Sequence, residues 1–213
     1  MSKAEIRKPG ALPLALPGFE KINRYWDPMH NMCAAKILPG EYYVTCESEI
    51  VVTVLGSCIS VCVRDPVAGV GGMNHFMLPV RQHKSVGSWS VDSSQEQAMR
   101  YGDSAMKRLL NEILSHGGRR ENLEAKIFGG GRIIEQMTDI GASNIDFIHK
   151  YVKSIGLRLV NEDTGGIYPR KVYYFLQEGK VRVKKLRTLH NDTIIQREVS
   201  YLEQLDESVD SGD

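Results

Sequence analysis

The chain has 213 residues, of which 42% are hydrophobic, so it can bury one substantial core and favours a single domain. Its 27 basic residues nearly balance 26 acidic ones, and a formal charge of +1 argues against general binding to nucleic-acid phosphates. The longest apolar runs, such as residues 50–55, fall far short of the roughly 20 residues that span a bilayer. We therefore expect a protein that binds no nucleic acid and is not embedded in a membrane.

Residues 1–36 lack a sustained hydrophobic period and are predicted to form an N-terminal extension that docks partly through Phe19, Tyr25 and Trp26. Prolines interrupt the short apolar stretch near the start, which disfavours a secretory signal. The expected location is therefore the cytoplasm, with reduced thiols at Cys33, Cys46, Cys58 and Cys62.

From residue 37 onward, short segments rich in Val, Ile, Tyr and Thr predict strands, because branched side chains pack well on a pleated surface. These segments are 41–45, 50–55, 59–64 and 70–78. The polar stretch 79–94 is expected to be a mobile surface loop that could cover a site. Residues 95–116 then predict an amphipathic helix, with an i+4 ladder of Tyr101, Ala105, Leu109 and Ile113.

The later part of the chain alternates strand, glycine turn and helix. Residues 125–128 predict a buried strand that runs into a glycine turn, and residues 143–155 predict a helix. Further strands are expected at 157–161, 172–176 and 181–186, the last two joined as a hairpin. The pattern indicates an α/β fold of layered mixed β-sheets flanked by helices. It forms a single domain over residues 37–190, followed by a C-terminal tail, 191–213, with a disordered acidic end.

Cys58 directly follows a predicted strand and a Gly56-Ser57 turn, where backbone N–H groups can point outward as an oxyanion hole. Seventeen residues later, His75 is a lone imidazole in an otherwise apolar strand. Neighbouring strands could bring the two side chains together, where the imidazole would favour the thiolate and shuttle its proton. Cys58 and His75 are thus a candidate nucleophile and base.

A structural role is the alternative for both side chains, since a strand cysteine is usually a small hydrophobe and a strand histidine is usually a satisfied core group. Cys62 lies in the same apolar run without a glycine turn before it, and it is assigned to the core. A metal site built from Cys58, Cys62 and His75 leaves the fourth ligand unidentified and is disfavoured.

Two glycine-rich segments have open interpretations. Gly129-Gly130-Gly131 lacks the spacing of a nucleotide-binding loop and is a tight turn or a wall of a substrate groove. Thr164-Gly165-Gly166 with Arg170 either allows close approach of a peptide backbone or simply makes a loop.

Several motifs in chain order, spanning about residues 41–186, resemble the CheD family of chemoreceptor glutamine deamidases. They are Leu55-Gly56-Ser57-Cys58, Asp65-Pro66, Gly72-Met73-Asn74-His75-Phe76-Met77-Leu78-Pro79, Arg100-Tyr101-Gly102-Asp103, Ala125-Lys126-Ile127-Phe128-Gly129-Gly130 and Asp163-Thr164-Gly165-Gly166. The resemblance implies a layered α/β fold similar to that of glutamine-deamidating bacterial toxins. It also implies hydrolysis of specific receptor glutamines to glutamate in bacterial chemotaxis.

The resemblance assigns the nucleophile to Cys58, the acid and base to His75, and a third catalytic residue to Thr53, with Ser57 as its substitute. Gly56, Ser57 and Gly130 are the expected oxyanion and substrate-binding positions. A glutamyl thioester on Cys58 is the expected intermediate, and neither metal nor organic cofactor is required.

The partners implied by this resemblance are methyl-accepting chemotaxis receptors and, as a further candidate, a CheC-type phosphatase. A non-catalytic adaptor that binds receptors or such a phosphatase is the alternative function. Esterase or transglutaminase chemistry at the same thioester is a third.

Overall fold

The computed structural model describes residues 12–79, 91–133, 140–186 and 191–210. In this part of the chain, two mixed five-stranded sheets have the orders β1-β2-β4-β9-β10 and β3-β6-β5-β7-β8. The strands of the first sheet are β1 (Asn23–Asp27), β2 (Met32–Lys36), β4 (Glu49–Leu55), β9 (Arg170–Phe175) and β10 (Lys180–Lys185). Those of the second sheet are β3 (Tyr42–Thr45), β5 (Ile59–Asp65), β6 (Val70–Asn74), β7 (Glu124–Gly129) and β8 (Arg158–Thr164).

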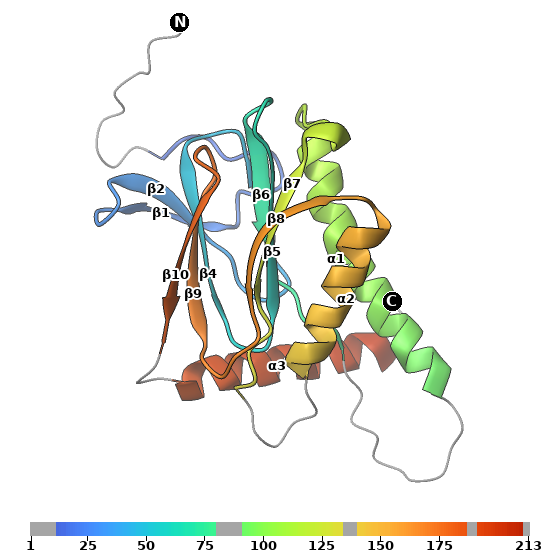
Figure 1. Ribbon diagram of the computed structural model, residues 1–213. Coiled ribbons are helices and arrows are strands. Elements are labelled where there is room, and N and C mark those ends of the chain that lie inside the picture. Colours follow the sequence, from blue (N-terminus) through green and yellow to red (C-terminus); the bar gives the residue numbers. More distant parts are fainter. Residues whose placement is uncertain (1–11, 80–90, 134–139, 187–190, 211–213) are drawn as a thin grey trace, which may run out of the picture.

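Three α-helices complete the described fold: α1 (Val91–Ser115), α2 (Ile140–Ser154) and α3 (Asn191–Asp210). The helices α1 and α2 cover the outer face of the second sheet, whereas α3 runs across one end of both sheets (Figure 1). One buried core joins the layers, since it contains Val51 of the first sheet, Val61 of the second and Ile148 of α2. This arrangement confirms the predicted α/β fold of layered mixed sheets flanked by helices.

A short 3-10 helix, Arg120–Asn122, links α1 to β7. Among the described residues, no helix is both long and apolar enough to cross a membrane.

The predicted strands from residue 41 onward agree with the observed ones to within a few residues. Most of them combine branched side chains with buried positions, whereas β8 and β10 contain no buried residue. The N-terminal segment differs from its interpretation as an extension. Residues 23–36 supply β1 and β2, and Cys33 to Lys36 pair in parallel with Glu49 to Val52 of β4. Ala34 and Ala35 are fully buried there, although alanine carries little strand propensity. Tertiary pairing with β4 decides the structure of this segment.

Phe19 is buried just before these strands, and its ring packs edge-on against Tyr42 and Tyr43 at centroid distances of 5.3 Å. At the other end of the chain, α3 includes residues 206–210 of the predicted acidic end, and residues 211–213 lie outside the described residues. Most of the predicted mobile loop, residues 80–90, lies outside the described residues, whereas positions 91–94 belong to α1.

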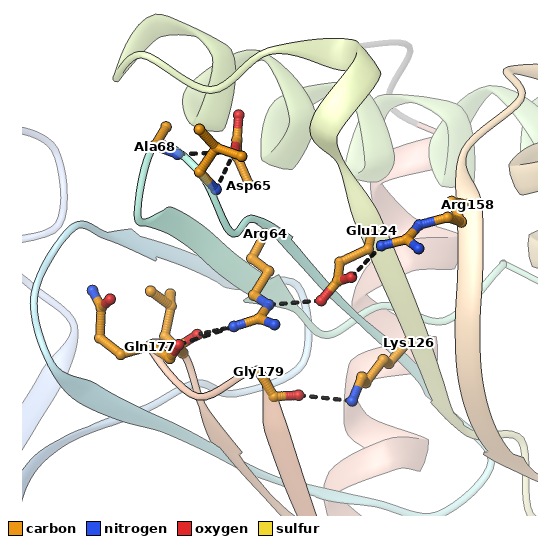
Figure 2. A network of polar contacts seen from close by, with 10 residues as sticks. Arg64, Asp65, Ala68, Glu124, Lys126, Arg158, Gln177 and Gly179 are labelled. Atoms are coloured by element: carbon orange, nitrogen blue, oxygen red, sulfur yellow. Dashed lines mark hydrogen bonds and ion pairs between the residues drawn. The ribbon is translucent and has the colours of Figure 1, made fainter.

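A network of charged side chains fixes the second sheet to the β9–β10 turn of the first (Figure 2). Arg64 of β5 donates to Glu124 of β7 at 2.7 Å and to the Gln177 carbonyl in the turn at 2.9 Å. Lys126 adds a hydrogen bond of 2.7 Å to the Gly179 carbonyl. Because the Arg64 and Glu124 side chains are largely shielded from water, these bonds hold the relative position of the sheets more firmly than exposed pairs would.

Candidate active site

The loop between β4 and β5, residues 56–58, contains the predicted nucleophile and is called here the cysteine loop. Its carbonyl groups are all held from one side: Gly131 N–H donates to the Gly56 carbonyl at 2.7 Å, Asn144 Nδ2 to Ser57 at 2.9 Å, and Gly130 N–H to Cys58 at 2.8 Å. In a trans peptide the N–H of a residue points opposite to the carbonyl of the preceding residue, so the Ser57 and Cys58 amides face away from the groups that hold the Gly56 and Ser57 carbonyls.

The three loop amides converge on one carboxylate, that of Glu198 in α3. Gly56 N–H and Cys58 N–H donate to its Oε1 at 2.8 Å and 3.2 Å, while Ser57 N–H and Ser57 Oγ donate to Oε2 at 2.8 Å and 2.6 Å. Glu198 is only 2% exposed. The cysteine loop is therefore a built anion-binding site, which is the property that an oxyanion hole requires.

The glycine turn after β7 makes this geometry possible. Gly129 has a φ of 115°, a conformation that L residues rarely adopt, and a Cβ there would collide with the Cys58 carbonyl oxygen. Gly130 is likewise left-handed, and its N–H is committed to the Cys58 carbonyl. In this conformation Gly130 supports the cysteine loop from behind and does not offer its amide to a ligand.

His75 follows β6 and lies between the two sheets, with 2% of its surface exposed. Its Nδ1 lies 2.8 Å from Thr53 Oγ1, and the Thr53 hydroxyl donates to the Ile37 carbonyl at 2.9 Å. A hydroxyl has a single proton, so the Thr53 oxygen must accept from Nδ1–H. This tautomer leaves Nε2 as the unprotonated nitrogen of a neutral imidazole, and Nε2 has no hydrogen-bond partner among the described residues.

The Cys58 thiol, a ring nitrogen of His75 and a carboxylate oxygen of Glu198 all lie within 4.8 Å of one another. A pair of hydrogen bonds between Ile59 and Phe76, both 2.9 Å, brings the two chain segments side by side. The predicted proximity of Cys58 and His75 is thus present in the fold, although their contact joins a loop to a strand end and not two central strand positions.

Among the described residues, these three side chains are also close enough together to be considered as ligands of a metal ion. Both carboxylate oxygens of Glu198 already accept hydrogen bonds from the cysteine loop, and a cation there would face a cluster of N–H donors. The donor set fits an anion better than a cation. Cys62 does not belong to this group, because it lies within β5 opposite Met73 and Lys126 and its pKa is raised by burial.

Burial sets the protonation state of the pair. It raises the pKa of the Cys58 thiol well above its usual 9.0, and the negative charge and hydrogen bonding of Glu198 raise it further. Burial also lowers the pKa of His75 to about 3, with the positive charge of Arg197 acting in the same direction. At neutral pH the site therefore holds a protonated thiol and a neutral imidazole.

Two residues that contact the cysteine loop were not identified from the sequence. Asn144 of α2 is fully buried, donates to the Ser57 carbonyl and accepts from Leu78 N–H, with both bonds 2.9 Å. Glu198 comes from the segment that was interpreted as a tail. Each is a polar residue on an apolar helical stripe, with Ile148 four positions after Asn144 and Leu202 four positions after Glu198, and this is the signal that could have revealed them.

The second glycine-rich segment has a structural role in this conformation. Arg170 is 2% exposed and donates to the carbonyls of Gly129 at 2.6 Å and Asp163 at 2.9 Å, and also to Gly165. Gly165 N–H in turn donates to the Gly129 carbonyl at 2.9 Å. These bonds fix the end of β8 against the glycine turn that supports the cysteine loop.

A thiol beside an imidazole, with three backbone amides aimed at a carboxyl group, defines a cysteine hydrolase that acts on carbonyl compounds. A family model described as CheD chemotactic sensory transduction matches residues 77–185. The chain is 54% identical over 202 residues to a protein of Halorhodospira halophila, covering 95% of this chain and 93% of that one. It is 47% identical over 207 residues to a protein of Hahella chejuensis, covering 97% and 96%.

Both relatives carry the name Probable chemoreceptor glutamine deamidase CheD. The chain belongs to the CheD family, which confirms the resemblance found in its sequence motifs.

Proposed function

We propose that this protein is a glutamine deamidase that converts specific chemoreceptor glutamines to glutamates. The observation that carries this proposal is the convergence of three cysteine-loop amides on a side-chain carboxyl group beside Cys58 and His75. A site that binds a glutamate carboxyl in this way can also bind a glutamine carboxamide and the oxyanion formed from it. The chemoreceptor substrate follows from the names of the family relatives.

The reaction begins with a proton transfer within the buried pair. His75 Nε2 takes the thiol proton as Cys58 Sγ attacks the Cδ of the glutamine side chain. The amides of residues 56–58 stabilise the oxyanion, and the imidazolium then donates its proton to the departing ammonia. A glutamyl thioester remains on Cys58. Water loses a proton to Nε2 as it attacks the thioester, and the imidazolium returns this proton to the departing Cys58 thiolate. The carboxylic acid formed then loses its proton to ammonia. Overall, one carboxamide and one water give one carboxylate and ammonium.

Thr53 is a positioning residue in this proposal. Its oxygen accepts from Nδ1–H and so presents Nε2 to the thiol, and it also stabilises the imidazolium that forms during the reaction. Ser57 is the other hydroxyl near the site, but in this conformation it donates to Glu198 and not to the imidazole.

The test is the conversion of glutamine to glutamate in a receptor-helix peptide by purified protein, followed by mass spectrometry. We expect Cys58→Ala and His75→Ala to lose activity, whereas Cys46→Ser, at an exposed cysteine, should retain it. Full activity of Cys58→Ala would refute the cysteine mechanism. Receptor binding without any deamidation by the wild-type protein would favour the non-catalytic adaptor.

Two further assignments belong to the same proposal. We infer a cytoplasmic location, which is supported by four free cysteines, three of them buried. A CheC-type phosphatase is the further proposed partner, and pull-down with purified phosphatase would test it.

A further inference from the structure

The helix α3 crosses the end of the sheets at which the cysteine loop joins β4 to β5 (Figure 1). Its docking is specific. Its side chains Leu202 and Leu205 are buried, at 6% and 5% exposure. The hydroxyl of Tyr201, also in α3, forms a hydrogen bond with that of Tyr101 in α1. These contacts place Glu198, one turn before Leu202, directly over the cysteine loop.

The carboxylate of Glu198 is bound by the cysteine loop. It accepts hydrogen bonds from the three amides of residues 56–58 and from the Ser57 hydroxyl, and the Cys58 thiol also hydrogen-bonds to it. A buried carboxylate without partners is strongly unfavourable, so α3 can dock in this way only because those donors are available. The same donors are the ones that a substrate carboxamide needs, and both groups cannot occupy them together.

Gly56 shows how closely α3 approaches the loop. A Cβ at this position would lie 2.7 Å from Glu198 Oε2 and would collide with Ile133. Only glycine leaves room for the carboxylate to reach the amides here.

Glu198 is also chemically the product of the proposed reaction, a glutamate side chain on a helix with its carboxyl group beside the thiol. We propose that α3 is an intramolecular pseudo-product: Glu198 closes the active site, and a substrate helix reacts only after α3 has moved away. This inference rests on the proposed deamidase function, because it takes the cysteine loop to be the site that binds the glutamine carboxamide. The closed form is also unreactive, because the negative charge of Glu198 opposes formation of the Cys58 thiolate next to it.

The first test measures access to Cys58 and requires no substrate. Alkylation by iodoacetamide, located by peptide mass spectrometry, would be compared in wild type, Glu198→Ala and Glu203→Ala. Glu203 is an exposed glutamate of the same helix and serves as the matched control. We expect alkylation about tenfold faster or more in Glu198→Ala, because several charge-assisted hydrogen bonds hold the closed form, and a wild-type rate in Glu203→Ala. An unchanged rate in a Glu198→Ala protein that melts cooperatively would overturn the proposal.

The second test uses the near-isosteric Glu198→Gln variant, which places a carboxamide where the carboxylate lies. If Glu198 lies where the glutamate product of the reaction would lie, Cys58 should convert the introduced glutamine back to glutamate within the same molecule, with water consumed and ammonia released. The expected conversion is first order, independent of protein concentration, and absent from the double variant with Cys58→Ala. If the introduced glutamine persists in a folded protein that is still active on the receptor peptide, Glu198 does not lie in the position of the product.

The receptor-peptide assay separates this inference from the proposed function. Faster deamidation by Glu198→Ala than by wild type supports both. Faster alkylation without deamidation of any receptor peptide would refute the proposed deamidase function, while α3 would still control access to Cys58. Loss of deamidation in a folded Glu198→Ala protein would instead make Glu198 part of the machinery and refute the pseudo-product.

Discussion

The hydroxyl of Thr53 offers the sharpest test of how the site works, and Thr53→Val removes it at nearly constant volume. The substitution leaves two buried groups without their partner, His75 Nδ1–H and the Ile37 carbonyl. An unsatisfied buried polar group costs about 1–3 kcal/mol. We therefore expect the free energy of unfolding to fall by about that amount or somewhat more.

The effect on catalysis follows from the same contact. Without Thr53 Oγ1, the imidazole loses both its fixed tautomer and the acceptor that stabilises its protonated form. A loss of about 1–3 kcal/mol in the transition state corresponds to a rate decrease of roughly 5- to 150-fold. The decrease should appear in kcat with KM nearly unchanged, because Thr53 does not contact the cysteine-loop amides that bind the carboxamide.

Steady-state deamidation of a receptor-helix peptide and denaturant unfolding would measure the two effects. Thr53→Ser keeps the hydroxyl and should restore most of the rate. Thr45→Val removes a buried hydroxyl outside the site, where it accepts from Glu47 N–H at 3.0 Å, and should change stability alone. A Thr53→Val protein with wild-type kcat, or a Thr53→Ser protein as slow as Thr53→Val, would refute the positioning role.

Three further predictions concern the surroundings of the site. Gly129→Ala should cost more than 2 kcal/mol or so and abolish deamidation, whereas Gly156→Ala, also at positive φ but with open space around it, should cost only about 1–2 kcal/mol. Asn144→Ala should lower kcat and cost about 1–3 kcal/mol by freeing the Ser57 carbonyl and Leu78 N–H, while Asn122→Ala, far from the site, should leave kcat unchanged. The pKa of His75 falls from 6.5 to about 3 on folding, so its contribution to stability is fully present above pH 6.5 and decreases as the pH drops toward 3. The slope is at most about 1.4 kcal/mol per pH unit. His75→Asn should lack this component in urea titrations between those pH values, and equal slopes for the two proteins would contradict the assignment.

The sequence alone determined the central part of this protein. The strands from residue 41 onward and the helices α1 and α2 follow from local patterns of branched or helically spaced apolar residues. All of them except β8 and β10 bury such side chains. Cys58 and His75 were identifiable because a cysteine after a glycine turn and a lone polar ring in an apolar strand are local departures from those patterns.

The remaining features depend on contacts between distant parts of the chain. The strand β2 contains Ala34 and Ala35 and depends on pairing with β4, which a local pattern does not encode. The hydrogen bond from His75 Nδ1 to Thr53 joins the segment after β6 to β4 of the other sheet, and its direction depends on the Ile37 carbonyl. Glu198 reaches the cysteine loop across sequence separations of 140 to 142 residues. Sequence patterns indicate which face of a helix or strand is buried. The contact that closes the site depends instead on how α3 packs against the ends of two sheets.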